Sequence, residues 1–343
     1  YKSGLSAAAV FASAVFGAIS GSAAATLTCI GAIMMPHLRR ANYPDGVSAA
    51  VLIAASPLGL LIPPSAAQIL YAWVTQQSVL KCFLATIGPA FVLIFFLCVV
   101  NFFMLRRRDD LLLSEIPENF VAEFGKRSWF ALPALLMPFI ILGGIYGGIM
   151  TPTEAAGFAV IYALPVGFWV YKGLTWETFT AVLRESAVTI GVIMVMVFIV
   201  LIESRFLIFE DIPGMAKSLV FSISENPVIV LLMVNLVMVL IGMLMDDVSG
   251  ILLSAPLLLP VVTSVGMDPI HFAAVLGVNL GMGNITPPTA PLLYLGCRVT
   301  DVPVNKVIWP TVLFIVFAWL PTLMITTFVP KIALWLPNLV FGS

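Results

Sequence analysis

The strongest constraint on this chain is an uncharged apolar segment near its beginning. Residues 3–36 contain no charged side chain and no histidine. A bilayer core needs only ~20 helical residues, so the segment is too long for one straight crossing. Its middle, Ile19-Ser20-Gly21-Ser22, is small and polar. Such backbone is tolerated at membrane depth only where protein buries it or where it lines a cavity. The segment therefore predicts two short helices that meet at a broken tip, as in a re-entrant hairpin.

Composition fixes the class of protein. Of the 343 residues, 61% are hydrophobic and 10% are charged, whereas a soluble domain carries ~25% charged residues. We therefore expect an all-α polytopic membrane protein in a lipid bilayer. A net charge of -1 offers no basic surface for nucleic acid. The four cysteines lie in apolar runs without metal-binding spacing, and the two histidines stand alone, so no cofactor is expected.

Charged residues divide the rest of the chain into further apolar segments. Between the first hairpin and residue 225 we expect five crossings, at residues 46–80, 82–105, 128–150, 155–171 and 186–202. Two apolar arms, 226–245 and 248–267, then flank Asp246-Asp247, and segment 269–297 and crossing 307–330 follow. Basic residues favour the cytoplasmic face. The basic residues share this face only if the first hairpin returns to the side from which it entered. They are Arg39-Arg40, Arg106 to Arg108, Lys126-Arg127 and Lys172.

An internal repeat links the two parts of the chain. A shift of 224 positions places Pro36 on Pro260 and gives eight identities over residues 36–65, which include the double prolines Pro63-Pro64 and Pro287-Pro288. It also places Ser22 on Asp246. Because an odd number of crossings separates the two hairpins, the second enters from the opposite face. The sequence thus predicts two inverted-topology repeats, each with a re-entrant hairpin and a broken helix, an architecture typical of secondary transporters.

The tips and breaks supply oxygen atoms that suit a hard cation such as Na⁺. Proline leaves carbonyl groups of the preceding turn unpaired, and hydroxyl and acidic side chains lie nearby. The predicted ion-binding residues are Ser20, Gly21, Ser22, Thr26, Ser56, Gly59, Pro63, Ser65, Asp246, Ser249, Asn279, Gly283 and Thr286. Amino ends of helices favour an anionic group. The predicted substrate-binding residues are Ser22, Pro64, Asn284 and Pro288.

Simpler interpretations exist for three of these features. A serine in a membrane helix usually bonds to its own turn or to a neighbouring helix, which would account for Ser56. Asp246-Asp247 would also fit a solvated loop between two crossings. Thr151-Pro152-Thr153-Glu154 has the pattern of a capping box with proline at the first helical position, so we interpret it as a helix start and not as a ligand site.

At these residues the chain resembles the large membrane subunit of tripartite ATP-independent periplasmic (TRAP) transporters. The matching stretches follow the family's order and cover nearly the whole chain. They are Ile19 to Gly31, Leu58 to Ser65, Gly143-Gly144 through Thr151 to Ala156, Gly266 to Phe272, and Asn279 through Thr286-Pro287-Pro288. The chain departs from the family pattern at Pro57, where glycine is more usual, and at Thr289-Ala290, where an apolar residue and glycine are more usual.

The resemblance implies a Na⁺-coupled elevator-type importer of the bacterial inner membrane. A periplasmic substrate-binding protein would deliver a small organic anion, such as a C4-dicarboxylate or sialic acid, and a small membrane (Q) subunit would complete the permease. Residues 1–80 and 226–298 would form the transport domain, and residues 81–225 and 299–343 would form scaffold crossings and arm helices. The family usually has scaffold helices before the first hairpin, so we expect the sequence to be an amino-terminally truncated piece.

Three alternatives stay open at this stage. The closest is an ion-coupled carboxylate carrier with the same hairpins that works without a binding protein. A channel would need a continuous polar pore lining. A membrane-embedded enzyme would need paired acids, a histidine dyad or a metal set at membrane depth, and the sequence shows none of these, so we expect no enzymatic activity.

Overall fold

All regular secondary structure within the described residues is helical. The computed structural model describes residues 2–108, 110–112 and 120–342, and these contain α-helices and two π-helical turns but no strand. Part of the polar stretch that follows Arg106, residues 113–119, lies outside the described residues, as does Tyr1. The chain divides into two compact units, Tyr1–Leu113 with Ser204–Ser343, and Ser114–Glu203.

Seven helices among the described residues are long and apolar enough to cross a membrane, or eight if a bent helix pair counts as one span. This confirms the all-α polytopic membrane fold. The bent pair, Asp45–Leu61 and Ala66–Val74, meets at 44°, at the first predicted break. Both arms of the second predicted hairpin qualify as spans by length and composition, so its re-entrant character stays a prediction.

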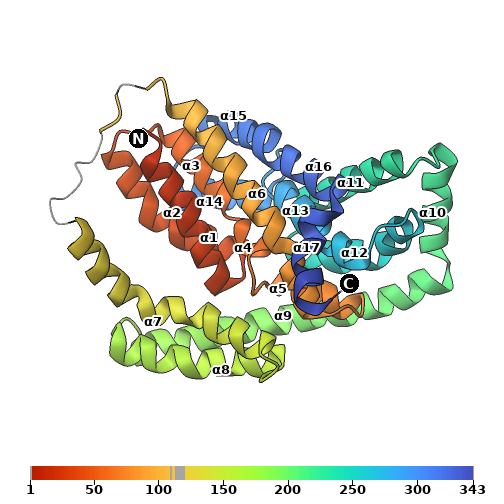
Figure 1. The fold of residues 1–343 in the computed structure, drawn as a ribbon, viewed down its shortest axis with the longest axis horizontal. Coiled ribbons are helices and arrows are strands. Elements are labelled where there is room, and N and C mark those ends of the chain that lie inside the picture. Colours follow the sequence, from red (N-terminus) through yellow and green to blue (C-terminus); the bar gives the residue numbers. More distant parts are fainter. Residues whose placement is uncertain (1, 109, 113–119, 343) are drawn as a thin grey trace. The chain divides into compact units, whose positions relative to one another are not determined.

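The larger unit begins and ends with related sets of helices (Figure 1). The first set is α1 Gly4–Ser20, α2 Ala23–Arg40, α3 Asp45–Ala55, α4 Leu58–Leu61, α5 Ala66–Val74 and α6 Val79–Leu105. The second set is α11 Pro227–Leu244, α12 Asp247–Ser264, α13 Pro269–Gly283, α14 Pro291–Thr300, α15 Val304–Phe314, the π-helical turn η2 Ile315–Trp319 and α16 Leu320–Phe328. Helix α10, Ile212–Ile223, precedes the second set, and α17, Pro330–Phe341, follows it.

The helix bounds follow the offset of 224 positions that the sequence repeat indicates. Helices α2 and α12 begin and end at equivalent residues, since Ala23 and Arg40 correspond to Asp247 and Ser264. Helices α3 and α13 likewise begin at equivalent residues, Asp45 and Pro269. The offset therefore applies to whole helices and not only to the stretch of sequence identity.

The contacts between the two sets are reciprocal for the equivalent helices α2 and α12 and for the equivalent helices α3 and α13. Helix α2 packs against α14 while α12 packs against α5, and α3 packs against α15 while α13 packs against α6. Reciprocal contacts of this kind arise when two similar units are related by a two-fold axis. The opposite orientation of the two sets in a bilayer stays a prediction.

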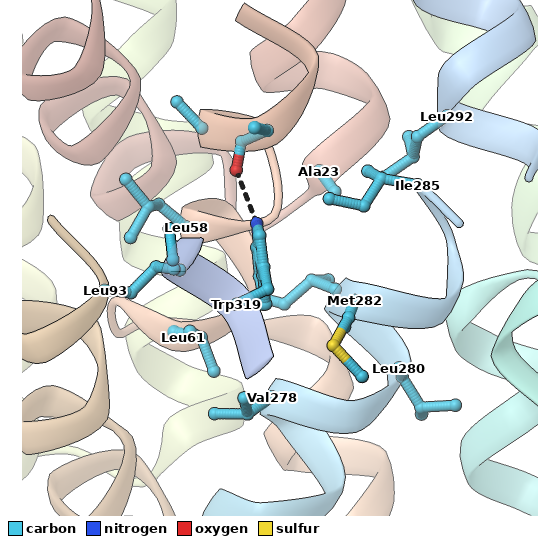
Figure 2. Close-up of a cluster of buried hydrophobic side chains, with 14 of the residues drawn as sticks. Ala23, Leu58, Leu61, Leu93, Val278, Leu280, Met282, Ile285, Leu292 and Trp319 are labelled. Carbon is cyan, nitrogen blue, oxygen red and sulfur yellow. Dashed lines mark hydrogen bonds between the residues drawn. The ribbon is translucent and has the colours of Figure 1, made fainter. Parts of the chain in front are cut away.

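The core of the larger unit contains a buried tryptophan that contacts both sets. Trp319 is fully buried, and its indole N–H donates a hydrogen bond of 3.1 Å to the carbonyl oxygen of Ala54, near the end of α3. Figure 2 shows Leu58 and Leu61 of α4 and Val278 and Met282 of α13 around the indole. A buried carbonyl at the end of α3 is thereby paired, as buried backbone polar groups need to be.

The smaller unit contains α7 Phe120–Tyr146, α8 Pro152–Pro165 with the π-helical turn η1 Val166–Val170, and most of α9 Trp176–Phe209. The predicted capping box is present, because the Thr151 side chain accepts from the Glu154 N–H and the Glu154 carboxylate accepts from the Thr151 N–H. The polar residues 176–185 form the first turns of α9. No proline interrupts this helix, so helical hydrogen bonding continues through its polar first turns.

Candidate functional site

The first hairpin turns at the predicted residues. Helix α1 ends at Ser20, and Gly21 adopts a left-handed conformation with φ of 62°. Ser22 caps α2, since its Oγ accepts a hydrogen bond from the Ala25 N–H. A side chain at position 21 would place Cβ 2.6 Å from the Pro64 carbonyl oxygen. Only glycine therefore allows this tip to approach the first break.

Three oxygen atoms gather at this tip. The Thr26 hydroxyl donates to the Ser22 carbonyl over 2.8 Å and lies 3.2 Å from the Ser20 hydroxyl. Gly59 packs directly against them, because a Cβ there would lie 2.8 Å from both the Ser22 carbonyl oxygen and Thr26 Oγ1. The structure thus brings together Ser20, Gly21, Ser22, Thr26, Gly59 and Pro64 of the predicted set.

Ser65 follows the first double proline and has an unusual environment. Its hydroxyl oxygen is buried and has no hydrogen-bond partner within the described part of the chain. Buried polar groups are normally paired, so this unpaired hydroxyl, between two residues whose backbone atoms contact Gly21 of the tip, is a candidate ion ligand. On the tip side of the same break, the Ala66 N–H donates to the Gly21 carbonyl over 3.4 Å.

The second hairpin has the same outline but different side chains. Met245 is extended between α11 and α12, and Asp246 caps α12 by accepting from the Ser249 N–H and hydroxyl. Asp247 accepts a hydrogen bond from the side-chain amide of Asn284 at the second break. The Thr289 hydroxyl donates to the Met243 carbonyl over 2.6 Å. The second tip therefore also lies against its own break, with carboxylates in place of hydroxyls.

A close glycine contact holds the hairpin to the broken helix in each set. A Cβ on Gly283 would lie 2.7 Å from the Gly242 Cα, and a Cβ on Gly17 would lie 2.8 Å from the Gly59 Cα. Sequence reasoning selected Gly59 and Gly283 but missed Gly17 and Gly242. The available signal was a glycine in the last turn of each first hairpin arm.

Four predicted ligands lie apart from the cluster or use their polar atoms locally. The Ser56 hydroxyl donates to the Ile53 carbonyl of its own turn, as the simpler interpretation expects. The Thr286 hydroxyl likewise donates to the Met282 carbonyl. Asn279 bonds to Asn235, which bonds to Thr327, so it belongs to a buried polar chain between α13, α11 and α16.

Pro63 is buried, and the bonds Pro63-Pro64 and Pro287-Pro288 are both cis.

The helix ends at the first tip favour the binding of a cation and of an anion side by side. The carboxyl end of α1 and the amino end of α2 meet there, with only Gly21 and Ser22 between them. The carboxyl end of a helix carries a partial negative charge that favours a cation, and the amino end favours an anion. Within the described residues, no group of three or more His, Cys, Asp or Glu could hold a metal, so the candidate ion ligands are mainly hydroxyl, carbonyl and amide oxygens.

Known proteins resemble this chain along almost its whole length. Residues 1–332 match the family model described as the tripartite ATP-independent periplasmic transporter, DctM component. The C4-dicarboxylate TRAP transporter large permease protein DctM of Pseudomonas aeruginosa is 35% identical over 98% of this chain and 78% of its own length.

Two further relatives broaden the comparison. The sialic acid TRAP transporter large permease protein SiaM of Vibrio cholerae is 33% identical over 97% of this chain and 77% of its own length. The isethionate TRAP transporter permease protein DctMQ of Oleidesulfovibrio alaskensis is 33% identical over 93% of this chain. The chain spans 50% of the length of that relative.

Proposed function

The chain belongs to the DctM component family of TRAP transporters, and we propose that it imports a small organic carboxylate across the bacterial inner membrane with Na⁺ as the coupling ion. Its relatives include a C4-dicarboxylate permease and a sialic acid permease. Both substrates carry carboxylate groups. A periplasmic substrate-binding protein and a small membrane (Q) subunit would complete the transporter.

The oxygen cluster at the first tip is the observation that carries this proposal. Ser20, the Ser22 carbonyl and Thr26 lie within hydrogen-bond distance of one another, and the Ser65 hydroxyl is buried without a partner. Hard cations are bound by oxygen ligands of this kind. An anionic substrate near the amino end of α2 would then gain from a cation held beside it, which gives a physical basis for coupled transport.

The paired hairpins and breaks also support an elevator mechanism. Each hairpin is fixed to its own broken helix by a close glycine contact, so a hairpin and its break would move as one body. In this mechanism residues 1–80 and 226–298, which form the predicted transport domain, carry the ion and the substrate together past a scaffold of the remaining helices. The predicted substrate contacts are Ser22 and Pro64 on the first side and Asn284 and Pro288 on the second.

Uptake in proteoliposomes tests the proposal. The permease is reconstituted with its small subunit, and the purified binding protein is supplied with labelled C4-dicarboxylate or sialic acid. We expect accumulation only with an inward Na⁺ gradient, and equal accumulation without the gradient would reject sodium coupling. Uptake that does not need the binding protein would favour the carrier alternative, and single-channel currents would favour a channel.

A further inference from the structure

An apolar pocket lies on the surface of the larger unit, and no residue of either hairpin tip lines it. Its volume is about 480 Å³, within the ~300–1,000 Å³ range of ligand pockets. The lining residues are all apolar: Phe96, Val99, Val100, Phe103 and Met104 of α6, Leu313 of α15, and Phe317 of η2. Phe103 is 55% exposed and Phe317 is 57% exposed, so the pocket opens to the surroundings of the helices.

Positive charge stands at one end of this pocket. The Arg106 guanidinium lies over the ring of Phe103, 4.7 Å from its centroid. Arg106 and Arg107 are exposed, and neither forms an ion pair with a carboxylate within the described residues. Arg108 differs, because it pairs with Asp110 over 3.5 Å. The Arg106 guanidinium therefore adjoins the apolar lining of the pocket, and Arg107 is the next residue along the chain.

The position of the pocket along α6 matches one leaflet of a bilayer. Helix α6 is a candidate membrane span that ends at Leu105, so Arg106 and Arg107 fall at the membrane–water interface, where basic side chains meet lipid headgroups. At 1.5 Å per residue, the distance from Leu105 back to Phe96 is about 14 Å. Half of a ~30 Å hydrocarbon core is nearly the same depth.

We propose that this pocket binds an anionic phospholipid, with one acyl chain between α6 and η2 and the phosphate on Arg106 and Arg107. The occupant must be apolar over one leaflet and negatively charged at the interface, which describes an anionic lipid. A membrane helix from a protein partner would have to place acidic residues at that depth. The lipid would connect α6 of the first helix set to α15 and η2 of the second.

Native mass spectrometry of the assembled permease tests this site. The probes are phosphatidylglycerol and phosphatidylcholine with identical acyl chains. We expect one phosphatidylglycerol to be retained in preference to phosphatidylcholine. Each basic charge near a membrane surface changes the affinity for anionic lipid about fivefold, so the double variant Arg106→Gln/Arg107→Gln should weaken retention more than tenfold. Leu313→Trp should reduce retention without changing the charge, because it fills the pocket.

Arg40→Gln is the matched control. Arg40 is exposed at the carboxyl end of α2 and is another basic residue of the predicted cytoplasmic face, but it does not line the pocket. Retention should be unchanged in this variant. An equal loss of phosphatidylglycerol retention in Arg40→Gln would show that the lipid is attracted to the basic face as a whole, and it would overturn the proposal of a specific lipid site. Full retention in Leu313→Trp, or a phosphatidylglycerol that the large subunit retains alone but loses in the assembled permease, would also overturn it.

Discussion

The two hairpins share a backbone plan and differ in charge. In the first, hydroxyls and a backbone carbonyl gather between Ser20, Ser22 and Thr26. In the second, Asp246 stands at the position equivalent to Ser22, and the next residue, Asp247, accepts a hydrogen bond from Asn284. The residues after the double prolines differ as well, since Thr289 bonds to the second tip while the Ser65 hydroxyl is unpaired in the described chain.

This difference indicates a division of roles. Neutral oxygens at the first tip can coordinate a cation without repelling an anion that binds beside it. Two adjacent carboxylates at the second tip would repel a carboxylate substrate unless a cation first neutralised them, because like charges in a partly buried site interact strongly. On the proposed function, ion binding at the second tip would therefore have to precede substrate binding there.

The largest expected effect comes from adding a methyl group where hairpin and break touch. Gly59→Ala would place Cβ 2.8 Å from the Ser22 carbonyl oxygen, and Gly283→Ala would place it 2.7 Å from the Gly242 Cα. Overpacking of this kind costs about 1–3 kcal/mol and shifts backbone. We expect both variants to lose at least tenfold in initial uptake rate in proteoliposomes.

The matched control is Gly157→Ala in α8, where an added Cβ would meet no atom within 4 Å. This variant should transport normally. Two different outcomes would separate the roles of the two halves. Gly59→Ala would raise the Na⁺ concentration needed for half-maximal uptake, whereas Gly283→Ala would mainly raise the substrate concentration needed for half-maximal uptake. Normal uptake in both variants would show that close packing at the tips is not needed.

A smaller effect is expected from the two helix caps. Ser22→Ala and Asp246→Ala each remove a side chain that caps a hairpin helix, which typically lowers stability by about 1 kcal/mol. Only Asp246→Ala also removes a negative charge. We expect both to weaken the Na⁺ dependence of uptake, with the larger rise in half-maximal Na⁺ concentration for Asp246→Ala.

Asp246→Asn separates the cap from the charge, because asparagine caps helices as well as aspartate does. If charge matters, this variant should resemble Asp246→Ala in its Na⁺ response while it keeps the stability of the unaltered protein. A wild-type Na⁺ response in Ser22→Ala and Asp246→Ala would remove both residues from the ion site.

The smallest effect on transport is expected from Trp319→Phe. The variant keeps an aromatic ring in the core but leaves the buried Ala54 carbonyl without its donor, which should lower the free energy of unfolding by about 1–3 kcal/mol. The offset places Phe95 at the equivalent position of the first set, where it is 62% exposed. Phe95→Leu should change thermal stability little, and an equal loss in both variants would contradict the asymmetric role of Trp319.

Local features explain why much of the candidate site was predictable. A small polar tip in a long apolar segment, a capping side chain and a double proline each act within a few residues. The sequence repeat places Ser22 and Asp246 at equivalent positions, and in the structure each side chain caps the helix that follows it. The partners of Ser56 and Asn279 could not be read from the sequence, because a hydroxyl or amide donor bonds to whichever acceptor the packing brings near it, here the Ile53 carbonyl and the Asn235 side chain.

The sequence alone determined that this chain is an all-α membrane protein and located both hairpin turns and both breaks. These follow from apolar length, helix caps and proline, which are properties of neighbouring residues. Tertiary structure alone decided that Asp247 meets Asn284, that Gly17 and Gly242 contact the broken helices, and that Trp319 pairs with Ala54. The helices are apolar on most faces, so their hydrophobic pattern does not specify which face meets which partner, and only close packing of the folded chain selects these contacts.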